Sequence, residues 1–190
     1  MAPFPSFGGL GVYWNWALLN PLLSLHMYFR DFGHTRSPLS STTLVHRAFF
    51  CFEFPTSGVQ EFEPNMPEYE SLLWPLGMMF PFVNVRNVLR NIVGWAAPLK
   101  TRLFVVSGSK DTLMGVVLMR RMTEQYRQAF VALIRRKVLQ VGLSIADVDD
   151  KDGSAAAVGF TVIEGAGHHI QNDLQWEDAA SQILAFFEQL

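Results

Sequence analysis

Two short apolar runs, separated by a long segment with helical periodicity, most constrain how this chain can fold. The runs cover residues 101–107 and 159–163 and are rich in β-branched side chains, which is typical of strands buried on both faces. Residues 112–141 between them predict a helix. Its expected inward face consists of Met119, Met122, Tyr126, Phe130, Leu133 and Ile134. Because strand, helix and strand follow one another, we expect a right-handed crossover between parallel strands, and then a last amphipathic helix over 174–190.

Composition restricts the class of protein further. The chain has 190 residues, a net charge of −2 and one cysteine, Cys51. A charge so close to neutral argues against nucleic-acid binding, and a lone cysteine excludes a disulfide framework and a multi-cysteine zinc site. Residues 1–29 carry no charged side chain, but prolines and glycines interrupt them and a basic leader is missing. We therefore expect a buried segment rather than a membrane span or a signal peptide, and a soluble, cytoplasmic protein.

The first half of the chain differs in composition from the second. Of the 25 aromatic residues, 18 lie at or before Trp95, and nine of the ten prolines precede residue 90. Short aromatic pieces separated by prolines predict short helices joined by turns. We expect one helix capped by Ser40 or Ser41, one over 68–79 interrupted at Pro75, and one over 83–95. The chain therefore divides into a helical region, 1–98, and an α/β region, 99–190.

Each predicted strand is followed by a loop with side chains suited to catalysis. Asp111 follows the first strand in Gly-Ser-Lys-Asp, and His168 follows the second in Glu-Gly-Ala-Gly-His-His. Because parallel strands open their carboxyl ends onto one edge of the sheet, the two side chains can form a hydrogen-bonded pair. The carboxylate would hold the imidazole in one tautomer and stabilise it when protonated. This pattern predicts His168 as a general base near neutral pH.

These two loops, in this order, resemble the C-terminal third of an α/β-hydrolase. The resemblance rests on SGSKDTLM, the helix that follows it, and VIEGAGHHIQND. It implies a partial α/β-hydrolase fold, in which a helical cap precedes the last parallel core strands and their flanking helices. It also implies Asp111 as the acid, His168 as the base and His169 as a residue that shapes the pocket. The implied activity is hydrolysis of an ester or similar bond in an apolar small molecule, without a cofactor.

The nucleophile of that family has no counterpart here. The chain contains no Gly-x-Ser-x-Gly elbow, and the family's His-Gly-type oxyanion loop is also absent. We expect that roughly the first half of a hydrolase lies outside this chain. That half would contain the Ser that forms the acyl-enzyme. The chain alone should then show little turnover. The first predicted strand would also lose a neighbour, so we expect self-association through an exposed sheet edge.

Less specific explanations stay open for the same residues. Asp111 can cap the helix expected from Thr112, and His168 can be a loop histidine bonded to the backbone. A protein that binds an apolar ligand or a partner without turnover would also fit an aromatic-rich cap.

Other kinds of site are weighed as alternatives. The segment His168–Asp173 matches the His-His-x-x-x-Asp core of chloramphenicol-acetyltransferase-like acyltransferases, in which His169 would be the base. A metal site formed by His168, His169 and Asp173 lacks a fourth ligand. We expect no calcium in the acidic loop 146–159, because Phe160 occupies the position that needs Glu. Cys51 near His46 is expected to be a small buried hydrophobe rather than a nucleophile.

Overall fold

The computed structural model describes residues 5–22, 25, 29, 41–66, 77–93, 103–139 and 158–189. These residues form a mixed α/β structure with a two-stranded parallel sheet. In chain order the elements are α1 (Leu10–Leu19), α3 (Thr42–Phe49), α4 (Thr56–Phe62), the 3₁₀-helix η3 (Glu63–Asn65), α6 (Val85–Val93), β1 (Leu103–Gly108), α7 (Val116–Arg135), β2 (Val158–Ile163), the 3₁₀-helix η4 (Ile170–Asn172) and α10 (Trp176–Glu188).

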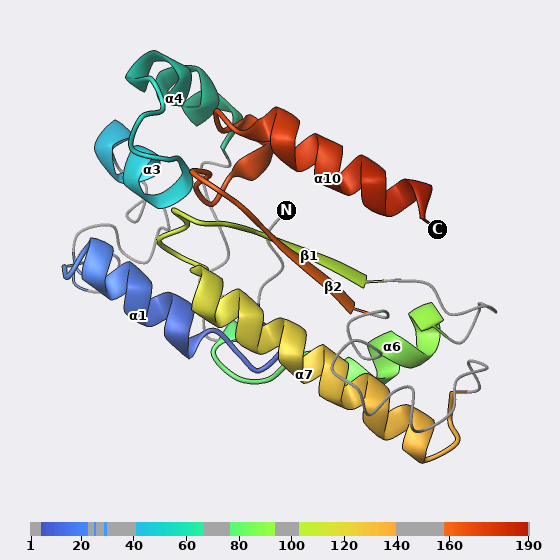
Figure 1. Ribbon diagram of the computed structural model, residues 1–190. Coiled ribbons are helices and arrows are strands. Elements are labelled where there is room, and N and C mark those ends of the chain that lie inside the picture. Colours follow the sequence, from blue (N-terminus) through green and yellow to red (C-terminus); the bar gives the residue numbers. More distant parts are fainter. Residues whose placement is uncertain are drawn as a thin grey trace.

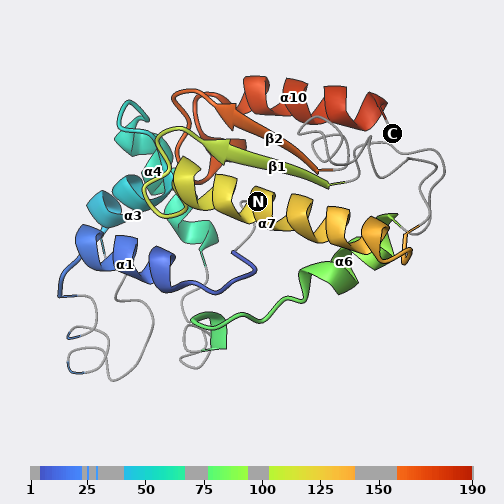
Figure 2. The same cartoon turned by 60° about the horizontal axis from the view of Figure 1, so that its bottom comes forward.

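The sheet has the parallel arrangement expected from the sequence. β1 pairs with β2 in a register that runs from Leu103 opposite Val158 to Gly108 opposite Ile163. Helix α7 covers one face of the sheet and α10 covers the other, so the sheet is the middle of three layers (Figure 1, Figure 2). Both strands end on the side where α3 lies (Figure 1). The loops after β1 and β2 therefore meet beside α3.

The core forms between α7 and the sheet, as the periodicity predicts. Every residue of the expected inward face of α7 is buried, and Val105 and Val158 meet it from the strands. Val12 of α1 and Leu89 of α6 belong to the same buried cluster, so both regions of the chain contribute to one core. Helix α7 begins at Val116 rather than at Thr112, and the sequence prediction was wrong by four residues because a turn precedes the helix.

The predicted cap of α3 is confirmed at Ser41. Its side-chain oxygen accepts a hydrogen bond from the backbone N–H of Leu44 at 3.3 Å, which satisfies one donor of the first turn. Helix α4 follows after Pro55 and was not expected from the sequence. Its Val59 packs with Val45 and Phe50 in a second buried cluster. The short helices α3 and α4 therefore pack against each other near the carboxyl end of the sheet.

The described part of the uncharged start is buried only in part: Pro5, Ser6, Gly8 and Gly9 are buried, but one face of α1 is not. In α1, Leu10, Trp14 and Leu18 follow one another at helical spacing, and each is about two-thirds exposed (65%, 68% and 65%). Only Val12 of this helix is buried. The outer face of α1 is therefore not buried within this chain, because apolar composition alone does not say which face finds a partner. Within the described ranges, no helix has the length and apolar character that crossing a bilayer requires.

The last helix also differs from the expectation of an inward apolar face. Ala179 of α10 is buried, and Phe186 stacks on Phe104 of β1 with ring centroids 5.0 Å apart. Ile183, Leu184 and Phe187 are exposed. Helix α6 confirms the helix predicted over 83–95 within its described part. Most of the helix predicted over 68–79 and of the acidic loop 146–159 lies outside the described residues.

Candidate active site

Backbone hydrogen bonds join the two loops that follow the strands. The N–H of Ser109 donates to the carbonyl of Ile163 at 2.9 Å, and the N–H of Lys110 donates to that of Ala166 at 2.8 Å. Gly108 lies where the loops are closest, and a Cβ there would overlap the carbonyl groups of Ala166 and Gly167. The loops are therefore held side by side, and this contact brings the residues that follow each strand together.

Asp111 is a buried acidic residue at the carboxyl end of the sheet. One carboxylate oxygen, Oδ1, accepts the backbone N–H groups of Leu113 at 2.9 Å and Met114 at 2.7 Å. The other oxygen, Oδ2, lies 2.9 Å from Nδ1 of His168. The alternative role as a helix cap is wrong as stated, because Gly115 is the N-cap of α7. The side chain instead fixes the turn before the helix with one oxygen and meets His168 with the other.

His168 is partly accessible, with 16% of its side chain exposed against 1% for Asp111. Because an ionised carboxylate only accepts hydrogen bonds, Nδ1 of His168 carries the proton in this pair. Nε2 is then the ring atom that can take up a proton. The ring of Phe49 lies over the imidazole with centroids 5.7 Å apart. The hydrogen-bonded pair expected from the sequence is present.

His169 points into aromatic surroundings instead. Its ring contacts those of Phe49, Phe50 and Phe62, the last at a centroid distance of 4.7 Å. The side-chain amide of Gln171 donates to Nε2 at 3.1 Å. Within the described part of the chain, Nδ1 is buried without a hydrogen-bond partner. Burial, followed by the neighbouring His168, lowers the pKa of His169, so protonation of this imidazole is disfavoured in the folded chain.

Around His169, the aromatic side chains of the expected cap pack against one another. Phe50 stacks on Phe54 with centroids 4.2 Å apart and meets Phe62 edge to face at 5.2 Å. These rings cover His169 and fill the space between α3 and α4 with side chains.

The sequence suggested Asp173 only as a metal ligand or as part of an acyltransferase motif. In the structure, this side chain instead accepts hydrogen bonds from the backbone. Its buried carboxylate accepts backbone N–H groups of Cys51 and Gly167 on Oδ2, at 2.9 Å and 2.7 Å, and of Leu174 on Oδ1, at 2.8 Å. Among the described residues, no group of three His, Cys, Asp or Glu side chains is placed to hold a metal ion. The signal that sequence reasoning missed is long-range, since Cys51 lies 122 residues from Asp173.

The hydroxyl and thiol groups near the pair are engaged elsewhere. The Ser109 hydroxyl donates to Glu164 at 3.0 Å and accepts the N–H of Gly165 at 2.8 Å, and Thr112 donates to the carbonyl of Arg47. Cys51 is buried, and burial together with a hydrogen bond to Asp173 raises its pKa to about 11. A thiol with this pKa is protonated at neutral pH, which fits the expected small buried hydrophobe. His46 contacts the Cys51 carbonyl at 3.0 Å.

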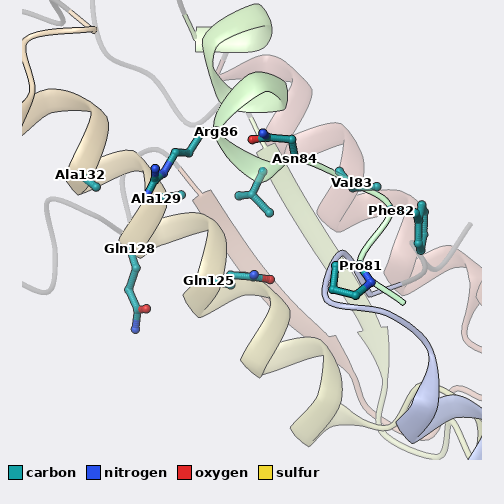
Figure 3. A pocket seen from close by; sticks show the side chains of 10 residues that line it. Pro81, Phe82, Val83, Asn84, Arg86, Gln125, Gln128, Ala129 and Ala132 are labelled. Carbon is teal, nitrogen blue, oxygen red and sulfur yellow. The ribbon is translucent and has the colours of Figure 1, made fainter. Parts of the chain in front are cut away.

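A cavity of about 660 Å³ lies elsewhere, between the start of α6 and the middle of α7. The segment from Pro81 to Arg86 lines one side, and Gln125, Ala129 and Ala132 line the other (Figure 3). None of the residues that line it belongs to the loops after β1 and β2. The cavity is therefore separate from the Asp111–His168 pair.

Comparisons of the chain with protein-family models, with curated proteins and with solved structures gave no match.

Proposed function

We propose that this chain is the C-terminal part of an α/β-hydrolase, with Asp111 as the acid and His168 as the base. The observation that carries the proposal is the 2.9 Å contact between Asp111 Oδ2 and His168 Nδ1, made between the loops of two adjacent parallel strands. The other oxygen of Asp111, Oδ1, holds the turn 111–114. A carboxylate that is fixed in this way orients the imidazole before any substrate arrives.

The proposed reaction is hydrolysis of an ester or similar bond in an apolar small molecule. Nε2 of His168 takes the proton of a Ser hydroxyl as its oxygen attacks the carbonyl carbon, and then gives that proton to the leaving alcohol. Water attacks the resulting acyl-enzyme by the same route in reverse, which releases the acid. Asp111 stabilises the imidazolium that forms in each step. The Ser is supplied by polypeptide outside this chain.

The proposal is tested by comparing the chain with a longer product of its gene. The coding sequence upstream of Met1 is read for an in-frame strand–Gly-x-Ser-x-Gly–helix, and both products are assayed with p-nitrophenyl butyrate. We expect turnover only from the longer product, with kcat/KM reduced about 10³- to 10⁴-fold by His168→Ala or Asp111→Asn. Rapid hydrolysis by the 190-residue chain, abolished by His168→Ala, would instead place the nucleophile inside it.

A second candidate is a protein that binds a small molecule without turning it over, which the cavity between α6 and α7 favours. Arg86 and Asn84 face this cavity from one side and Gln125 from the other (Figure 3). A library of small molecules is screened for compounds that raise the unfolding temperature. A shift that disappears in Gln125→Leu but persists in His168→Ala would support this candidate over the hydrolase.

A further inference from the structure

The carboxylate of Asp173 connects two distant parts of the chain directly beside His168. It is 2% exposed and accepts three backbone N–H groups: from Gly167 in the loop after β2, from Cys51 after α3, and from Leu174 before α10. Three short hydrogen bonds to a buried carboxylate are a strong local constraint, because charge-assisted bonds are stronger than neutral ones.

The backbone on both sides of His168 is fixed by this arrangement. Gly167 precedes it and is bound to Asp173, while His169 follows it and donates its N–H to the carbonyl of Phe49 at 2.7 Å. Gly167 also lies directly against residues 50–51, since a Cβ there would come 2.6 Å from the carbonyl carbon of Phe50. The peptide that carries His168 therefore has little freedom to rotate.

We infer that Asp173 is a positioning residue that aims the His168 imidazole at Asp111 without touching it. The inference rests on the proposed function, because it assigns Asp173 a role in orienting the proposed base. Burial and the nearby Asp173 raise the pKa of the Cys51 thiol to about 11, so the thiol stays neutral beside this side chain. Asp173→Asn replaces one carboxylate oxygen by an N–H donor, and at least one of the three backbone N–H groups then loses its acceptor.

The test is an NMR measurement on the purified chain, which needs no turnover. In the wild-type chain we expect His168 as the Nδ1–H tautomer, with a downfield Nδ1–H resonance that His168→Gln removes. In Asp173→Asn we expect this proton to exchange with water about 10- to 100-fold faster, because a hydrogen bond to a charged group is lost. The dispersed amide resonances of β1, β2 and α7 should stay, which shows that the fold is intact.

Ser109→Ala is the matched control. It removes the hydrogen bonds to Glu164 and Gly165 in the same pair of loops but leaves Asp173 untouched, so the His168 proton should exchange as in the wild-type chain. Retention of wild-type exchange in Asp173→Asn would overturn the inference and leave the Asp111–His168 pair standing. Absence of the resonance in the wild-type chain would overturn the pair itself, and with it the proposed function.

A measurement on the wild-type chain keeps the inference testable if Asp173→Asn does not fold. Amide hydrogen exchange of Gly167 and Cys51 is compared with exchange of the His168 Nδ1 proton under the same conditions. We expect all three to be protected together, because they belong to one hydrogen-bonded unit. Fast exchange of both amides beside a protected His168 proton would show that the orientation of His168 does not depend on Asp173.

Discussion

His168 Nδ1 lies 2.9 Å from Asp111 Oδ2, although 57 residues separate them in the chain. Asp111 serves the imidazole with one oxygen and the turn before α7 with the other. Its removal therefore affects both the fold and the proposed base.

Asp111→Asn is expected to lower the free energy of unfolding by about 1.5–3 kcal/mol. The charged acceptor of two buried N–H groups is lost, and hydrogen bonds to charged groups contribute about this much. Urea denaturation followed by circular dichroism measures the change. Glu61→Gln, on the exposed surface of α4, is the control and should change the stability by less than about 0.5 kcal/mol. An equally small effect of Asp111→Asn would show that neither the hydrogen bonds to Leu113 and Met114 nor the contact with His168 contributes to stability.

Gly108→Ala is expected to destabilise the chain by about 3 kcal/mol, at the upper end of the range for overpacking. The new methyl group would meet the carbonyl groups of Ala166 and Gly167, and backbone cannot rotate away as a flexible side chain can. Gly77→Ala is the matched control, since a Cβ there meets no atom within 4 Å. The measurement is the urea concentration at the midpoint of unfolding for each variant. Similar midpoints would mean that the loops after β1 and β2 are not tightly joined.

Stability should decrease on acidification through His169. Burial beside His168 lowers its pKa in the folded chain, so the unfolded chain binds the proton first as the pH falls. The contribution of His169 is complete above about pH 6.5 and is lost as the pH falls from there through its folded-state pKa. His169→Phe keeps an aromatic ring in the cluster and removes this titration. Unfolding free energies measured across this range should therefore fall less steeply for the variant, and parallel curves would contradict the assignment.

Cys51 should resist alkylation in the folded chain. Its pKa of about 11 leaves very little thiolate near pH 8, and its burial limits access. Iodoacetamide should react about 10²-fold or more slowly with the native chain than with the chain in urea. Because this is the single cysteine of the sequence, mass spectrometry of the intact chain reports it directly. Rapid labelling without denaturant would show that the contact between Cys51 and Asp173 opens readily.

The features that sequence patterns predicted well depend on local periodicity. The two β-branched runs became β1 and β2, and the spacing from Met119 to Ile134 gave the buried face of α7. The Asp111–His168 contact followed from topology, because parallel strands place their following loops at one edge. In each of these cases the pattern spans few residues or depends on the order of elements alone.

The features that could not be predicted depend on distant contacts or on short elements. Helix α4 has seven residues and only Val59 buried, which is too few for a periodic signal. The exposed faces of α1 and α10 are apolar in sequence, and only the three-dimensional arrangement shows which side chains find a partner. Asp173 binds Cys51 across 122 residues, and no local pattern contains that information.

The hydrogen bonds that Cys51 donates to Asp173 and that His169 donates to Phe49 have a consequence for how a substrate would reach the proposed base. They attach the carboxyl end of α3 to both neighbours of His168. If α3 swung away like a hinged cover, it would pull on the same peptide that orients the imidazole. In the proposed hydrolase, the entrance for a substrate would then lie on a side of His168 that α3 does not occupy, with α3 as a fixed wall of the proposed site.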